Sequence, residues 1–220
     1  MQNIELANHK KIVTQALSYN DAQTAINSMH YIIALEGANS TYKDSLAITY
    51  YRTGNYVSSH LLVKELLTSK PDNTQLLEMN AVSLQSLGAT KDAIAAYEIL
   101  FSKTKNMVHG YQLAMLQYRI KRLAEAQATI VQTLQCEDVE NAYLQFSIDK
   151  NQNQNVPLKV AAYNLQGLIA FELKDNAAAK QAFDKALEIM PEFTVATQNA
   201  NAVVVAMQNE QKVKRQSKKE

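Results

Sequence analysis

The side chains that most often carry catalysis or hold metals are few and scattered in this sequence. The four histidines, at positions 9, 30, 60 and 109, are too far apart in sequence to pair on one helical turn, and none lies near the single cysteine, Cys136. A catalytic thiol needs a neighbouring base and a zinc site needs several converging ligands. Cys136 is therefore expected to be a small buried residue. Glycine-rich phosphate-binding motifs are also absent from the sequence. The sequence predicts a protein that is not an enzyme and that binds no metal or cofactor.

The composition favours a folded, helical protein. Of the 220 residues 47% are hydrophobic, and only five are glycine and three are proline, whereas a turn-rich β fold needs more of both. The formal net charge of +1 provides no overall field that would attract nucleic acid or an acidic membrane. No specific nucleic-acid partner is therefore expected.

The sequence also bears on the compartment. No apolar run approaches the roughly 20 residues that a transmembrane helix needs. The first residues, Met-Gln-Asn-Ile-Glu-Leu, lack the basic and apolar regions of a signal peptide. These features predict a cytoplasmic protein, or a periplasmic one if a signal peptide has been removed.

The elements that position any functional residue form an internal repeat. Three columns of residues recur at separations of 34, 34, 33 and 53 positions. The first column is mostly alanine, the second is small, and the third is larger and apolar. Their members are Ala25, Ser59, Ala93, Ala126 and Ala179; Val13, Ala47, Ala81, Ala114 and Gly167; and Met29, Val63, Tyr97, Ile130 and Phe183. Such periodic apolar residues predict a packed core.

This pattern resembles the tetratricopeptide repeat family, whose period is 34 residues. The last unit carries the clearest match, with residues of the family's types at the family's spacing: Tyr163, Gly167, Ala179, Phe183, Ala186 and Pro191. The resemblance implies an all-α fold, a right-handed superhelical stack of antiparallel helix pairs known as an α-solenoid. Helix pairs of this kind bury their apolar faces by stacking on their neighbours.

Residues 1–213 are expected to form a single domain. Its units are expected at about 6–39, 40–73, 74–106, 107–136 and 160–191, followed by a capping helix at 193–213. A basic, disordered tail is expected at 214–220, and its lysines would give nucleic acid or an anionic membrane only nonspecific contacts. Helices are predicted at 3–19, 22–36, 40–52, 56–69, 74–87, 90–104, 107–121, 124–136, 158–173, 176–190 and 193–213.

An insertion at 137–156 interrupts the repeat before its last unit. Apolar residues at 142, 144, 146 and 148 alternate with Tyr143, Gln145 and Ser147, a spacing typical of a half-buried strand. We predict a small β-hairpin with strands at 141–148 and about 152–156. Two roles remain open for it: a decorated loop of the kind that repeat arrays tolerate, or an edge that pairs with a strand of a partner or of a second copy.

The family resemblance also implies where a partner binds, because the first helix of each pair lines the concave groove. The positions implied are Lys10, Thr14 and Leu17 in the first unit, Glu172 in the last, and a main set of Asp44, Ile48, Tyr51, Arg52, Glu78, Val82, Gln85, Tyr111, Met115, Tyr118, Arg119, Asn164, Leu168 and Phe171. The lysine and asparagine pattern of the family's dicarboxylate clamp is missing, so binding of chaperone C-termini is not expected.

One pair of residues recurs within this set. Tyr51-Arg52 and Tyr118-Arg119 occupy equivalent positions two repeats apart. Tyrosine and arginine are enriched at binding hot spots, and arginine can bind a carboxylate through two hydrogen bonds. One hypothesis is an extended peptide ligand with an acidic group. The alternative is that these are solvated helix positions whose side chains cover apolar surface.

The sequence thus predicts a non-enzymatic scaffold that binds a protein or peptide partner in a concave groove. The resemblance extends to bacterial proteins that assist the assembly of envelope or secretion machinery. A homo-oligomer that self-associates through the insertion is the alternative.

Overall fold

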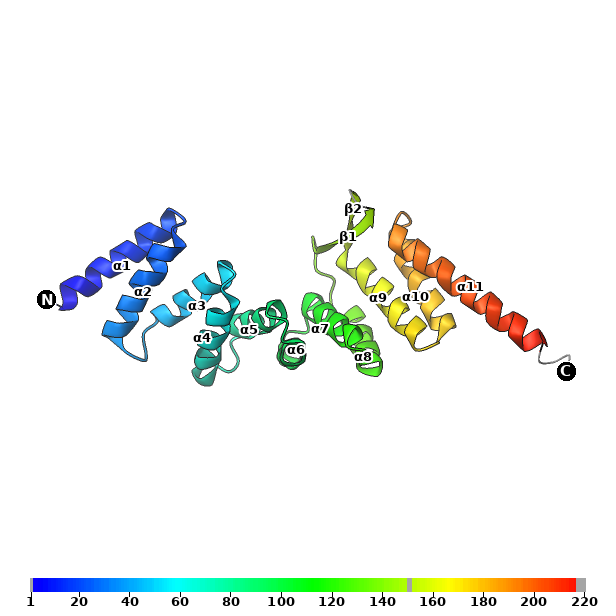
Figure 1. Ribbon diagram of the computed structural model, residues 1–220, viewed down its shortest axis with the longest axis horizontal. Coiled ribbons are helices and arrows are strands. Elements are labelled where there is room, and N and C mark those ends of the chain that lie inside the picture. Colours follow the sequence, from blue (N-terminus) through cyan, green and yellow to red (C-terminus); the bar gives the residue numbers. More distant parts are fainter. Residues whose placement is uncertain (1, 150–151, 217–220) are drawn as a thin grey trace. The chain divides into compact units, whose positions relative to one another are not determined.

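The structure, a computed structural model, describes residues 2–149 and 152–216. The chain divides into two compact units, Met1–Lys103 and Thr104–Glu220, which we call the N-terminal unit and the C-terminal unit (Figure 1). Both are built from antiparallel helix pairs, and a two-stranded hairpin lies between the eighth and ninth helices. The predicted fold class is therefore confirmed, while the single domain stays a prediction.

The N-terminal unit contains three helix pairs in sequence order. Its helices are α1 (Gln2–Ser18), α2 (Ala22–Glu36), α3 (Tyr42–Arg52), α4 (Tyr56–Ser69), α5 (Thr74–Ser86) and α6 (Thr90–Thr104), the last of which ends one residue into the next unit.

The C-terminal unit contains two helix pairs, the hairpin and a long last helix. Its elements are α7 (Met107–Arg119), α8 (Leu123–Leu134), β1 (Tyr143–Asp149), β2 (Gln152–Pro157), α9 (Leu158–Glu172), α10 (Asn176–Ile189) and α11 (Thr194–Gln216). The eleven helices of the described residues match the predicted ones, with boundaries that differ by at most three residues.

In each of the five pairs, the same type of turn connects the first helix to the second. One residue takes a positive φ of 58° to 74°, and the N–H after it donates to a carbonyl five residues back over 2.8–3.0 Å. This hydrogen bond is the one that ends a helix in a Schellman motif. The positive-φ residues are Asn20, Gly54, Gly88, Lys121 and Lys174. Their spacing follows the repeat, so each chain reversal occurs at the same point of its unit.

The three repeat columns form the core, as predicted. All five members of the first column are fully buried, with 0% of their surface exposed. The large third-column residues are at most 2% exposed, and they fill the space beside the small residues. Small side chains therefore mark the close helix contacts, and large ones fill the gaps.

The predicted hairpin is also confirmed. Its antiparallel register pairs Tyr143 with Pro157 and Leu144 with Val156, and it becomes irregular between Ser147 and Asp149. Residues 142, 144, 146 and 148 are half-buried, whereas the alternating residues 143, 145 and 147 are exposed. The alternation in sequence thus gives one face to the helices and one to solvent.

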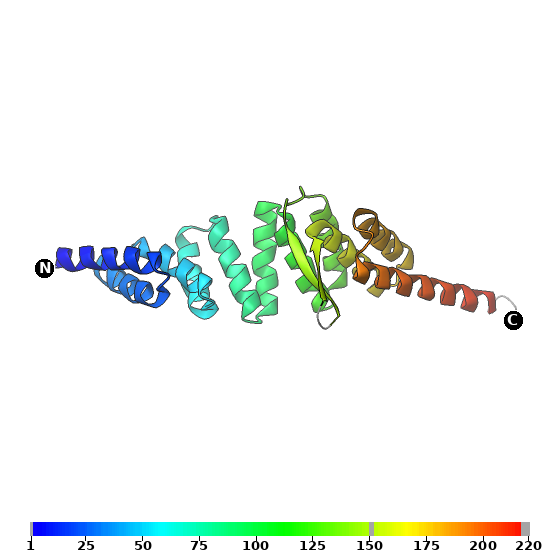
Figure 2. The same ribbon diagram turned by 90° about the horizontal axis from the view of Figure 1, so that it is seen from above.

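The hairpin lies beside α9 and α11 (Figures 1 and 2), and two sets of contacts join it to the α10–α11 turn. Phe146 meets the fully buried ring of Phe193 edge to face, with centroids 5.0 Å apart. The Gln154 amide donates to the carbonyl of Glu192 and accepts from the N–H of Thr194, over 2.7 and 3.3 Å. The hairpin is therefore joined to the α10–α11 turn as part of the unit's core.

The last helix continues further than expected. α11 extends to Gln216, three residues into the predicted tail, and residues 217–220 lie outside the described residues. In the described parts of the chain, no helix combines the length and the apolar character needed to cross a bilayer.

Candidate partner-binding surface

In the N-terminal unit, the implied position Tyr51 interacts with aromatic and charged side chains. This residue lies in the last turn of α3, is half-buried, and packs against Tyr56 with ring centroids 6.1 Å apart and an interplanar angle of 75°. Burial raises the pKa of Tyr51, and the negative charge of Glu78 on α5 raises it further. The charge of a carboxylate on the next first helix therefore acts on this tyrosine.

Tyr97, which sequence analysis assigned only to the core, contributes to the same place. Its hydroxyl donates to Oε1 of Gln85 over 2.7 Å. Burial, together with the charges of Tyr51 and Glu78, raises the pKa of Tyr97 well above its usual range. Tyr97 is a buried residue of α6 that reaches the surface of α5 through its hydroxyl, a role that periodicity alone does not reveal.

In the C-terminal unit, a related arrangement surrounds Tyr118. The ammonium group of Lys121 lies 5.4 Å from the centroid of the Tyr118 ring and 2.8 Å from Oε1 of Glu172. Burial and the charge of Glu172 raise the pKa of Tyr118, whereas the charge of Lys121 lowers it. Here too the charge of a glutamate on the next first helix acts on a tyrosine, although Glu172 ends α9 whereas Glu78 lies near the start of α5.

Several implied positions have apolar side chains that are half-buried. They are Ile48 and Val82 in the N-terminal unit, and Met115, Leu168 and Phe171 in the C-terminal unit. Such residues offer apolar contact area next to the polar groups of the two tyrosine clusters.

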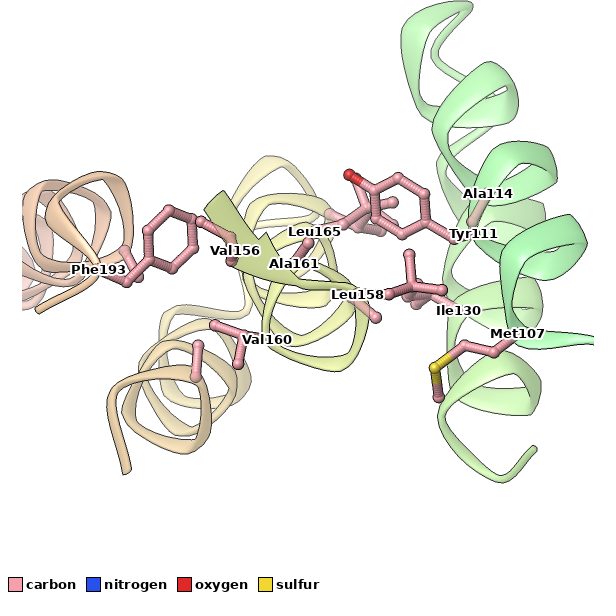
Figure 3. Close-up of a cluster of buried hydrophobic side chains, with 14 of the residues drawn as sticks. Met107, Tyr111, Ala114, Ile130, Val156, Leu158, Val160, Ala161, Leu165 and Phe193 are labelled. Carbon is pink, nitrogen blue, oxygen red and sulfur yellow. The ribbon is translucent and has the colours of Figure 1, made fainter. Parts of the chain in front are cut away.

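Two implied positions are not at the surface, and the resemblance-based assignment is corrected there. Tyr111 is 4% exposed and packs in the core among Met107, Ile130 and Leu165 (Figure 3). Burial raises the pKa of Tyr111 to about 12. Asn164 is 2% exposed, and its Oδ1 accepts a hydrogen bond from Asn199 over 2.9 Å. Neither side chain presents area to a partner.

The charged implied positions differ in whether they form ion pairs within the chain. Asp44 pairs with Lys70 at the end of α4, at 2.6 Å. Arg52 and Arg119 are exposed and have no ion-pair partner among the described residues. Because Arg52 follows Tyr51 directly on a helix, it lies about 100° further round the helix axis. The charges of Glu78 and Glu172, by contrast, act on the tyrosines, which does not favour an acidic ligand at the tyrosines themselves.

Two of the three first-unit positions, Lys10 and Thr14, line a shallow depression between α1 and Tyr42. A hollow of about 630 Å³ is lined by Lys10, Lys11, Thr14, Gln15, Ser18 and Tyr42. Lys10 forms an ion pair with Glu36 at 2.7 Å and lies 5.7 Å from the Tyr42 ring centroid. Leu17 is 48% exposed and does not line this hollow.

Within residues 2–149 and 152–216, no three His, Cys, Asp or Glu side chains converge as a metal site requires. Cys136 is half-buried rather than fully buried, its thiol lies 3.4 Å from the carbonyl oxygen of Gln132, and burial raises its pKa. A raised thiol pKa lowers the thiolate fraction and hence the reactivity of the group.

The outer edge of β1 was the second predicted interaction element. Ala142 accepts a hydrogen bond from the N–H of Leu158, and antiparallel pairs alternate, so the backbone groups of Tyr143 and Gln145 point away from β2. Self-association through this edge stays a prediction.

Comparison with known proteins agrees with this architecture. Residues 160–193 match the family model of the tetratricopeptide repeat. The search of curated proteins finds no match. A tetratricopeptide repeat protein from Parabacteroides merdae superposes with a TM-score of 0.64, at 14% identity, over 98% of this chain and 78% of that one.

Two further solved structures are similar. YrrB, described as a TPR protein with an unusual peptide-binding site, gives a TM-score of 0.63 at 16% identity, over 84% of this chain and 87% of that one. MamA from Desulfovibrio magneticus gives 0.61 at 12% identity, over 86% and 97%. Identities this low show the fold alone. The chain thus has the fold of tetratricopeptide repeat proteins, and its residues 160–193 match the model of that repeat.

Proposed function

We propose that this protein is a scaffold that holds a segment of a partner protein against the first helices of its repeats. The carrying observation is the recurrence of the tyrosine clusters. Tyr51 and Tyr118 occupy equivalent positions in different units, both are half-buried, and the charge of a glutamate of the following first helix raises the pKa of each.

The physical properties of these tyrosines suit a binding role. Each is partly buried, so its ring is fixed by packing and loses little conformational entropy when a partner binds. A tyrosine also combines a large apolar area with a hydroxyl that can form hydrogen bonds, which explains its enrichment at hot spots. The half-buried apolar residues nearby would exclude water from such a contact.

The proposal is tested by capturing partners from a lysate of the source organism. We expect the wild-type protein to retain a partner that the double variants Tyr51→Ala/Arg52→Ala and Tyr118→Ala/Arg119→Ala bind at least about tenfold more weakly, since hot-spot truncations cost 2 kcal/mol or more. Circular dichroism would establish that each variant is folded.

The matched control truncates a tyrosine and a cation on second helices. Tyr31 on α2 and Lys64 on α4 are both exposed, so Tyr31→Ala/Lys64→Ala should retain the partner fully. If the first-helix variants retain it as well as the control does, the first-helix surface is not the binding site.

A further inference from the structure

The hairpin sheet stops at β1, and within the described residues no further strand pairs with it. Tyr143 and Gln145 lie at the positions of β1 that form no hydrogen bonds with β2, so their N–H and C=O groups point outward. The residue opposite Tyr143 is Pro157, which has no N–H, as such a position permits. In the described parts of the chain, no other element forms a backbone hydrogen bond with Tyr143 or Gln145. β1 therefore presents an unpaired edge on which another strand can pair.

This edge lacks the features that usually prevent strand pairing. Natural edge strands are blunted by charged residues, by proline or by bulges. The segment 141–148, Asn-Ala-Tyr-Leu-Gln-Phe-Ser-Ile, contains no charged residue and no proline. The irregularity of the hairpin lies between Ser147 and Asp149, beyond the two outward-pointing residues. The segment from Tyr143 to Gln145 is thus regular and chemically suited to pairing.

The core covers β2 more completely than β1. Val156 of β2 is 0% exposed and lies in the core (Figure 3). Leu144, which is paired directly with Val156, is only half-buried, as are Ala142 and Phe146 on the same side of β1. The uncovered apolar area therefore lies next to the open edge. Side chains of an added strand would cover it.

The sequence of β1 is complementary to itself. When two copies of β1 pair antiparallel about a two-fold axis at Leu144, Tyr143 of each copy lies opposite Gln145 of the other. Each of these residue pairs can exchange two hydrogen bonds through the outward N–H and C=O groups. The two Leu144 side chains meet on the apolar side of the joined sheet. No like charges are brought opposite each other, so nothing in the segment repels a second copy.

We propose that the chain self-associates through β1, with the open edges of two copies paired antiparallel about Leu144 to form one continuous sheet. The contact is small, so the dimer should form in a concentration-dependent way. This surface is separate from the first-helix surface of the proposed function, and each can be tested without the other.

A pair of substitutions at Gln145 tests the backbone pairing. Gln145→Pro removes the outward N–H and keeps the hydrogen bonds between β1 and β2, whereas Gln145→Ala keeps the N–H. In sedimentation equilibrium from micromolar to millimolar protein, wild type and Gln145→Ala should dimerise. Gln145→Pro should dimerise at least about fivefold more weakly, because each residue pair loses one hydrogen bond. Slow exchange of the Val156 amide in Gln145→Pro would establish that its hairpin is intact.

Charges on the exposed face of β1 test the register. Tyr143 is 58% exposed and Gln145 is also exposed, so both tolerate substitution. Tyr143→Lys/Gln145→Lys places lysine opposite lysine, and Tyr143→Lys/Gln145→Glu places lysine opposite glutamate. The second variant should dimerise at least about fivefold more tightly than the first, since two cross-strand pairs change from repulsive to attractive.

Three results would overturn the proposal: a wild-type protein that stays monomeric at millimolar concentration, a dimer equally tight in Gln145→Pro, or equal affinities of the two lysine variants. A monomeric wild type whose lysate partner is lost by Gln145→Pro and retained by Gln145→Ala would assign the edge to a strand of another protein. Under the proposal, Gln145→Pro retains the partner that Tyr51→Ala/Arg52→Ala loses. Failure of dimerisation therefore leaves the first-helix surface unaffected.

Discussion

Replacing Phe193 by alanine is expected to lower the free energy of unfolding of the C-terminal unit by about 3–5 kcal/mol, the range for truncating a buried aromatic ring. The Phe193 ring is fully buried and lies between β1 and the helices, where it contacts Phe146 edge to face. Its loss would leave a cavity at the point where the hairpin meets the α10–α11 turn. Urea unfolding followed by circular dichroism measures the change.

The same substitution should loosen the hairpin specifically. Backbone amides of β1 and β2 should exchange faster with solvent, because the hairpin would lose its aromatic contact and keep the Gln154 hydrogen bonds and the packing of Val156. Tyr143→Ala is the control, since Tyr143 is 58% exposed on the opposite face, and its cost should stay within about 0.5 kcal/mol. A Phe193→Ala protein as stable as this control would show that the hairpin is not part of the core.

The second large effect is expected from adding a single methyl group at Gly167. A Cβ there would lie 2.5–2.7 Å from three ring atoms of Phe183, and that ring is 1% exposed, so it cannot move aside freely. Gly167→Ala should therefore destabilise the C-terminal unit by about 1–3 kcal/mol, the usual cost of overpacking a core. Urea unfolding again provides the measurement.

Shortening the opposing side chain isolates the cause. In the double variant Gly167→Ala/Phe183→Leu the added methyl group has room, so its cost should fall well below that in the single variant when each is compared with its own parent. If Gly167→Ala lowers the free energy of unfolding equally in the Phe183→Leu background, the loss arises from the helix backbone and not from the contact with the ring. Equal stability of wild type and Gly167→Ala would contradict the close packing itself.

The fold was predictable in detail because every repeat must bury the same pattern of small and large apolar residues, so the pattern recurs several times in the sequence. A single alanine says little, but five small residues at one spacing mark a helix contact, and the positive-φ turn recurs with them. The hairpin was predictable for a different reason. Its alternation of half-buried and exposed residues has a period of two that no helix shares.

The candidate site was only partly predictable, because one repeat position can have different environments in different units. Asp44, Glu78, Tyr111 and Asn164 occupy one column. The first two are charged and remain accessible, whereas Tyr111 and Asn164 are buried, and α11 supplies a partner for Asn164. The resemblance gave the column, but burial depends on which side chains fill it and on what packs over it.

Contacts between distant residues were beyond the sequence. Lys121 and Glu172 are 51 positions apart, and the hydroxyl of Tyr97 reaches Gln85 from a neighbouring helix. Their spacing carries no signal that would distinguish them from other charged or polar residues. Glu78 and Glu172 were already implied positions, but only the structure indicates that their charges act on Tyr51 and Tyr118.

Site-specific photo-crosslinking tests the central claim, that partners bind the first helices, most directly. A benzophenone amino acid is placed at Arg52 on α3 or Arg119 on α7, and in control proteins at Tyr31 on α2 or Ile99 on α6, all of which are exposed. After irradiation with the captured partner, the account predicts crosslinked product from the first-helix positions and little from the controls. Crosslinking mainly from Tyr31 and Ile99 would contradict it and would assign the partner to the second helices.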